Sequence, residues 1–169
     1  MALVLDGNGT MTVGDGDITG LVAGALPSNV IGAGAVLQVV SAFTITNTST
    51  TSSSYVAVTN LTASITPSRA SSKILVLVNM NLYSSSNNGE GAMTIYRAGV
   101  DLTAGAGFAN AYTGTSDFIM QTPMMILDSP SSTSSVTYAV FIKRTQGTAT
   151  LQTSLRGTTS TITLMEIAA

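Results

Sequence analysis

The chain has 169 residues, of which only 8% are charged, and its formal net charge is −2. Ser and Thr account for 47 of the 169 residues (28%), so hydroxyl groups rather than ions supply most of the polar surface. The absence of His, Cys and Trp excludes a disulfide framework, a thiolate zinc site, a His-ligated metal, a Cys nucleophile and a His general base.

The first 35 residues contain eight of the 16 glycines and show no hydrophobic period. Such a segment cannot build a core of its own, which predicts an extended N-terminal arm that lies against another surface. The apolar side chains expected to make the arm contacts are Leu3, Val4, Leu5, Ile18, Leu21 and Val22.

Several polar residues lie among the glycines of this arm, namely Asp6, Asn8, Asp15 and Asp17. The closing Glu of an EF-hand loop is missing, which leaves a looser calcium-binding turn and ordinary Gly/Asp turns as the alternatives.

No charged residue occurs between Ile18 and Ser68, which raises the question of a membrane segment. The longest uninterrupted apolar run, Val30–Leu37, is far shorter than the roughly 20 residues that a spanning helix needs. The first residues also lack the basic start and the apolar core of a signal peptide. We therefore expect no membrane span. Without a run of Lys or Arg, we also expect no binding to nucleic acid.

Alternation of apolar and polar residues begins at Val36 and predicts strands over 37–45 and 55–66. In both segments the odd-numbered apolar residues share one face. Lys73–Tyr83 is the strongest predicted strand, and apolar residues on both of its faces favour a central position in a sheet. Clusters of Ser and Thr predict the turns between these strands.

Further along the chain, Ala98-Gly99 predicts a two-residue hairpin between segments 92–97 and 100–103. The Gly- and Ala-rich segment 104–116 predicts a loop. Because Pro123 lies inside the apolar run 118–127, this run is predicted to be an edge strand or a broken one. Three more segments show strand-like alternation, at 136–144, 149–155 and 159–167.

No segment shows the spacing of an amphipathic helix. Eight or nine strands with frequent Ser/Thr/Gly turns predict an all-β protein, an antiparallel β-sandwich or jelly-roll-like domain over residues 36–169. The arm, residues 1–35, precedes this domain.

Five segments resemble a known family: Gly14–Leu21 (GDGDITGL), Val36–Val40 (VLQVV), Ser64–Val78 (SITPSRASSKILVLV), Leu127–Val136 (LDSPSSTSSV) and Ser160–Ala169 (STITLMEIAA). In these segments the chain resembles the small β-domain virion proteins of marine and cyanobacterial tailed phages, of the tail-fibre or head-decoration type. The resemblance implies a structural virion protein and assigns no catalytic residue. The chain is short for that family and lacks the long shaft of a full fibre.

Candidate chemistry is sparse, and we expect neither an enzyme nor a metal or cofactor. The eight acidic residues fall mostly in the arm, in turns or at strand ends, so no pair of carboxylates across a cleft is indicated. Five scattered Tyr and no Trp do not indicate an aromatic platform for sugars. Glu166, in the last strand, is expected to face solvent or to pair with Arg97 or Arg144.

Two groups of apolar residues suggest contacts between subunits. Leu75 and Leu77 form the second apolar face of the strongest strand, and three Met residues cluster on the predicted edge strand, where Met either fills gaps in a core or forms an adaptable interface. We expect a symmetric homotrimer whose interface includes Leu75, Leu77, Met120, Met124 and Met125.

The expected function is structural. The chain is predicted to lie exposed on the virion of a tailed phage as a capsid decoration or short appendage, held to other capsid or tail proteins by its arm. The alternative is a tail-fibre tip that binds a host receptor, with its exposed loops at 84–91 and 104–116.

Overall fold

The computed structural model describes residues 4–5, 11–12, 32–85, 89–112 and 117–169. The chain divides into two compact units, Met1–Gly32 and Ala33–Ala169. In the first unit, β1 (Val4–Leu5) pairs antiparallel with β2 (Met11–Thr12). The other predicted arm contacts, Leu3, Ile18, Leu21 and Val22, lie outside the described residues, as do the polar turn residues Asp6, Asn8, Asp15 and Asp17.

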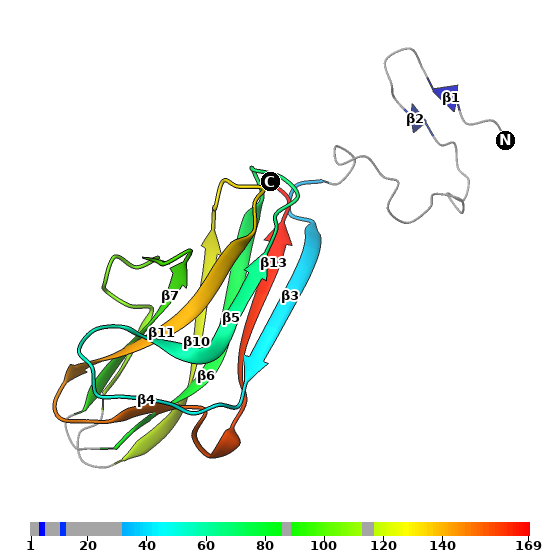
Figure 1. The fold of residues 1–169 in the computed structure, drawn as a ribbon. Helices are drawn as coiled ribbons and strands as arrows, with labels where there is room; N and C mark the ends of the chain where they lie inside the picture. The colour runs from blue at the N-terminus through cyan, green and yellow to red at the C-terminus, as the bar shows by residue number, and fades with distance from the viewer. Residues whose placement is uncertain (1–3, 6–10, 13–31, 86–88, 113–116) are drawn as a thin grey trace. The chain divides into compact units, whose positions relative to one another are not determined.

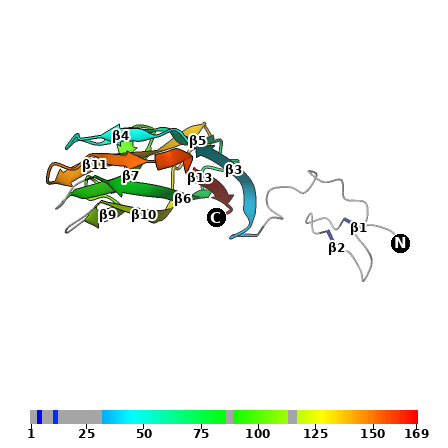
Figure 2. The same cartoon turned by 90° about the horizontal axis from the view of Figure 1, so that it is seen from below.

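The second unit consists of two antiparallel sheets that pack face to face (Figures 1 and 2). The first sheet contains β3 (Val36–Thr44), β4 (Thr48–Thr50), β6 (Lys73–Ser84), β10 (Phe118–Asp128), β12 (Leu151–Thr153) and β13 (Ser160–Ile167). The second contains β5 (Val56–Ile65), β7 (Glu90–Arg97), β8 (Val100–Asp101), β9 (Ala109–Tyr112) and β11 (Val136–Gln146).

In three places, two short strands pair one after the other along the same side of the sheet, and each such pair acts as one interrupted strand. β12 and β13 both pair with β6, while β4 pairs with β12 and β3 with β13. In the same way β8 and β9 both pair with β7. Each sheet is therefore four strands wide, in the order β10, β6, β13/β12, β3/β4 and in the order β5, β11, β7, β8/β9.

This order is that of a jelly roll, which confirms the predicted fold class. When β3/β4, β8/β9 and β12/β13 are each counted as one strand, the body has eight strands in chain order. The first sheet, read from β3, then contains the first, eighth, third and sixth strands side by side. The second sheet, read from β5, contains the second, seventh, fourth and fifth. Successive strands alternate between the two sheets, except at the hairpin from β7 to β8. At that hairpin Ala98 and Gly99 have φ values of 47° and 85°, as the predicted two-residue turn requires.

The core lies between the sheets and is built by alternation along each strand. On β6 the even-numbered residues point inward and are buried, and β6 is central, as predicted, because it has neighbours on both sides. Inward residues of the other strands close the core, among them Leu61, Met93, Ile95, Tyr138, Val140, Ile142, Leu151, Ile162 and Leu164, each fully buried.

Three local features differ from the expectations or refine them. Residues 109–112, predicted to be loop, form β9 against β7. Asn60 has a left-handed φ of 60° where β5 shifts its register against β11, and this reverses which residues face the core on its two sides. β10 is continuous through Pro123, which is tolerated because β6 is the only neighbour of β10 among the described strands.

The only helical segment in the described residues is a single 3₁₀ turn, η1 (Leu155–Gly157), between β12 and β13. Within the described part of the chain, no helix has the length and apolar character needed to cross a bilayer.

Candidate functional site

Glu166 is the most deeply buried acidic residue in the described part of the chain, and its side chain is fully shielded from solvent. Its Oε1 accepts hydrogen bonds from the backbone N–H and hydroxyl of Ser68 and from the hydroxyl of Ser72, each at 2.7 Å. Its Oε2 accepts one from Gln38 at 2.6 Å. The expectation that Glu166 faces solvent or pairs with an arginine is wrong, because neutral donors from a tight turn surround it.

These donors decide the charge state of Glu166. Burial works to raise the pKa of the Glu166 carboxyl, but the hydrogen bonds from Gln38, Ser72 and Ser68 outweigh it and hold the pKa below its ordinary value. The residue is therefore an ionised structural carboxylate that ties β13 to β3 and to the turn after β5.

Arg97 pairs instead with Asp128, at 2.8 and 2.9 Å from its two carboxylate oxygens. The buried phenol of Tyr138 donates to the same carboxylate at 2.6 Å. Burial, followed by this hydrogen bond, raises the pKa of Tyr138. Asp128 thereby links the end of β10 in one sheet to β7 and β11 in the other, which is a structural role.

Asp101 organises the loop after β8. Its carboxylate accepts hydrogen bonds from the hydroxyls of Thr94 and Thr103 and from the backbone N–H groups of Thr103 and Gly105. Burial favours a raised pKa for Asp101, yet these donors outweigh it and lower the pKa. Because these donors are all directed at the Asp101 carboxylate, its role is to stabilise the conformation of the loop rather than to transfer a proton.

The outer face of the first sheet is strongly apolar. Strand register places outward residues in rows across the sheet: Leu127, Leu75, Met165 and Val39 form one row. The next two rows are Met125, Leu77, Thr163 and Ser41, then Pro123, Asn79, Thr161 and Phe43. We name as the apolar outer face the residues Val39, Phe43, Leu75, Leu77, Met125, Leu127 and Met165.

Several of these side chains are unusually open to solvent for their type. Phe43 is 67% exposed, Met125 65%, and Val39 and Leu127 about half. Within the described outward rows the only charged residue is Lys73, at one end of the face, while Asp117 and Arg156 lie beside Tyr83 at the other end. A wide sheet face of this composition is typical of a surface that another protein covers.

The structure brings together only part of the predicted subunit interface. Leu75, Leu77 and Met125 share the apolar outer face, with Met125 directly opposite Leu77. Met124 instead points inward and is 4% exposed in the core, and Met120 lies on the same inward side near the sheet edge. The alternation of β10 separates neighbouring Met residues onto opposite faces.

The outer face of the second sheet has a different character. Tyr96 stacks on Phe141 with ring centroids 4.0 Å apart, and Tyr55 meets Tyr96 edge-on at 6.0 Å. The Lys143 ammonium lies 4.2 Å from the centre of the Tyr55 ring and also donates to the Gly105 carbonyl. Aromatic and loop residues thus cover one part of this face, and Thr62, Ser64 and Thr137 lie on another part of it.

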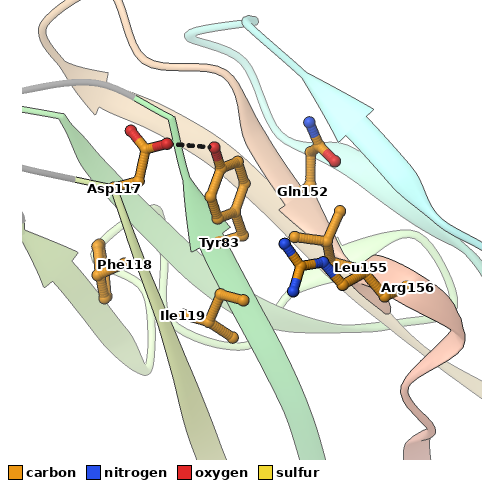
Figure 3. Close-up of a pocket in the computed structure, with 7 residues that line it drawn as sticks. All are labelled: Tyr83, Asp117, Phe118, Ile119, Gln152, Leu155 and Arg156. Atoms are coloured by element: carbon orange, nitrogen blue, oxygen red, sulfur yellow. Dashed lines mark hydrogen bonds between the residues drawn. The ribbon is translucent and has the colours of Figure 1, made fainter.

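A pocket of about 430 Å³ lies at the Tyr83 end of the first sheet. Tyr83, Ile119 and Gln152 form its floor as one row across three strands, and Leu155 and Arg156 of η1 form a wall. Figure 3 shows Tyr83 between the side that carries Asp117, Phe118 and Ile119 and the side that carries Gln152, Leu155 and Arg156. The Tyr83 hydroxyl donates to Asp117 at 2.8 Å, and this bond raises the pKa of the phenol.

Sequence reasoning missed this pocket because its residues come from four separate segments. Only the pairing of β6 with β10 and β12 brings Tyr83, Ile119 and Gln152 into one row. A polar residue at the end of an alternating strand is too common to serve as a signal. In the described residues, no three acidic side chains gather as a metal site would need.

No protein-family model matches the sequence. No curated protein matches it at a significant level.

Proposed function

We propose that this protein is a non-enzymatic structural subunit of a tailed-phage particle, built as a jelly-roll body that associates with copies of itself. The observation that carries the assembly role is the apolar outer face of the first sheet. The resemblance of five sequence segments to small virion β-domains supports the phage setting, and the jelly roll is a fold that viral capsid proteins use.

The occupant proposed for the apolar outer face is a second copy of this chain. The rows from Lys73 to Asn79 span four strands about 4.8 Å apart and roughly 23 Å along the strands, which gives a flat area on the order of 450 Å². In a trimer this face meets a different surface of the neighbouring copy, and an equal area of that copy is covered. Each contact then buries about 900 Å², close to the roughly 1,000 Å² expected of a specific protein–protein interface. Uncharged polar residues such as Ser41, Thr163 and Asn79 lie beside the apolar ones, as in an interface with an apolar centre and a polar rim.

We propose a homotrimer, with the arm of residues 1–35 holding the assembly to other capsid or tail proteins. Multi-angle light scattering tests the first statement, since the trimer has three times the 17.2 kDa mass of the chain. Met125→Glu is expected to yield monomers, because a charge at this open position would be buried between subunits. A monomeric wild-type protein at tens of micromolar would contradict the assembly role.

Ala57→Glu is the matched control. Ala57 is an exposed residue on β5, which lies at the edge of the other sheet as β10 does in the first. This variant is expected to keep the wild-type mass. Dissociation of both variants would mean that added charge, rather than the apolar outer face, determines the outcome.

The place of the subunit on the particle is a separate question. A capsid decoration or short appendage is the proposal, and a tail-fibre tip that binds a host receptor is the alternative. Immunogold labelling of intact particles separates them, since label over the head supports decoration and label confined to the far end of the tail supports the tip. The pocket beside Tyr83 is the observation that favours the alternative.

A further inference from the structure

We propose that the pocket beside Tyr83 binds a neutral saccharide. Its volume of about 430 Å³ falls within the range of small-molecule sites, about 300–1,000 Å³. It lies on the surface of the sheet and is lined by Tyr83, Asp117, Phe118, Ile119, Gln152, Leu155 and Arg156 (Figure 3). This inference adds a ligand site to the assembly role proposed above. The pocket lies at the Tyr83 end of the same sheet face, beyond the row of Pro123 and Asn79, and it stays open when a second copy covers only the apolar rows.

The polar groups of the pocket match a ligand that both donates and accepts hydrogen bonds. Asp117 receives the Tyr83 hydroxyl at Oδ2, and Oδ1 accepts no hydrogen bond within the described part of the chain. The side-chain oxygen of Gln152 accepts from Asn47 at 3.1 Å, which leaves its NH₂ group as a donor. The sugar hydroxyl group, which donates and accepts, fits this combination.

The charges of the pocket favour a neutral ligand over an anion. Arg156 forms no ion pair within the described residues, so its guanidinium remains a donor at the pocket wall. Asp117 supplies the opposite charge in the same pocket. An anionic ligand would gain from the arginine but would be repelled by the carboxylate, whereas a polyol can bond to both.

The apolar residues that line the pocket can contact the C–H groups of a sugar ring. Tyr83 and Phe118 supply aromatic surface, and Ile119 and Leu155 supply aliphatic surface. The C–H faces of a pyranose ring pack against such surfaces while its hydroxyls reach outward.

The wall formed by η1 is held in a strained backbone conformation. Ser154 and Arg156 have φ values of 52° and 58°, in the left-handed region that costs residues other than glycine about 1 kcal/mol or more each. The Ser154 hydroxyl is hydrogen-bonded to that of Ser160 at 2.9 Å, and Thr158 donates to the Leu155 carbonyl at 3.0 Å. This strained turn projects Leu155 and Arg156 into the pocket, and strain of this kind gathers at binding sites.

The pocket also lies at the end of the sandwich away from the point where the chain enters β3. Val36 and Lys73 both pair with Ile167 at one end, and Tyr83 lies ten residues further along β6, roughly 33 Å away. A body held through the segment before β3 therefore presents this pocket at its opposite end.

Saturation-transfer NMR tests the proposal with the methyl glycosides of glucose, galactose, mannose and N-acetylglucosamine, and with N-acetylneuraminic acid as an anionic comparison. At least one neutral glycoside is expected to receive saturation from the full-length protein. Binding of none of them, or of the anionic sugar alone, would overturn the proposal.

Two variants locate the site. Arg156→Gly removes the guanidinium and relaxes the left-handed backbone, so the fold is retained while affinity is expected to fall about tenfold or more. Lys73→Ala removes a positive charge from the opposite end of the same sheet face and is expected to leave affinity unchanged. Equal affinity of wild type and Arg156→Gly would place any sugar binding outside this pocket and overturn the assignment.

Light scattering on the same samples keeps this inference separate from the proposed function. A trimer that binds no neutral glycoside overturns the saccharide site alone, and a monomer that binds one through Arg156 overturns the assembly role alone.

Discussion

The side chain of Gln38 donates a hydrogen bond of 2.6 Å to Glu166 and so joins the first strand of the jelly roll to the last. Its nitrogen also donates to the Thr66 carbonyl at 2.7 Å. One amide thus connects β3, β13 and the turn after β5. The turn itself supplies the remaining donors to Glu166, from Ser68 and Ser72.

Replacing Glu166 by Gln is expected to lower the free energy of unfolding by about 1–3 kcal/mol. The new NH₂ group would face the NH₂ group of Gln38, and turning Gln38 over would leave the Thr66 carbonyl without its donor. Urea denaturation measures the loss. Glu90→Gln, at a position that is not fully buried, is the control and is expected to change stability little. Equal stability of wild type and Glu166→Gln would show that the hydrogen bonds to the Glu166 carboxylate make no net contribution to the free energy of unfolding.

Acid is expected to destabilise the wild type through the same group. Because the pKa of Glu166 is lower in the folded protein than its ordinary value of 4.5, the unfolded chain takes up the proton first as pH falls. The contribution of Glu166 is fully present above pH 4.5 and is lost as pH falls toward the folded-state pKa. Thermal unfolding at pH 7 and pH 3 should show a smaller drop for Glu166→Gln than for wild type. Parallel curves for the two proteins would contradict the lowered pKa.

Asn60 is expected to tolerate glycine but not a β-branched residue. Its φ of 60° is reached easily by Gly and at an added cost of about 1–2 kcal/mol by most other residues. Asn60→Val should therefore lower the denaturation midpoint while Asn60→Gly stays near wild type. Thr59 is the neighbouring exposed β5 position and is not among the residues with positive φ, so the control Thr59→Val introduces valine without strain at φ. If Asn60→Val had the same denaturation midpoint as wild type, β5 would have to pair with β11 in a different register that avoids the left-handed φ.

A chain that begins at Ala33 is expected to keep the stability of the whole protein. The cut preserves the hydrogen bonds of Gly34 and Ala35 to Ala168, at 2.8 and 2.9 Å, which close the start of β3 against the C-terminus. Removal of three further residues, to Val36, deletes these bonds and should lower the melting temperature. Both chains are expected to lose attachment to the particle with the arm. Normal copy number in particles for either one would show that the anchor lies in the jelly-roll body.

The fold could be predicted from the sequence where alternation is strict and turns are distinctive. β6 alternates over its whole length, and Ala98-Gly99 adopts the positive φ values of a two-residue hairpin. Prediction failed at Asn60, because one residue with positive φ exchanges the inward and outward positions of β5, and period-2 reasoning assumes that no such exchange occurs.

The candidate sites were harder to predict because they depend on pairing between distant segments. Leu75 and Leu77 could be placed on a second apolar face from β6 alone. Met124 could not be separated from Met125 without knowing which face of β10 meets the core. Glu166 gives no local sign that its donors come from a turn about 100 residues earlier, and the pocket residues meet only through the strand register.

The position of β13 between β3 and β6 also sets the order of events during synthesis. The strand that separates these two is the last strand of the jelly roll to be synthesised, so until then both expose unpaired edges and the buried face of β6 lacks Ile162 and Leu164. The jelly roll therefore closes only after translation of the body is complete, and its folding is governed by contacts of very long sequence separation. Nascent chains that stall before Ser160 would therefore expose these strand edges and be the ones that chaperones bind and proteases cleave.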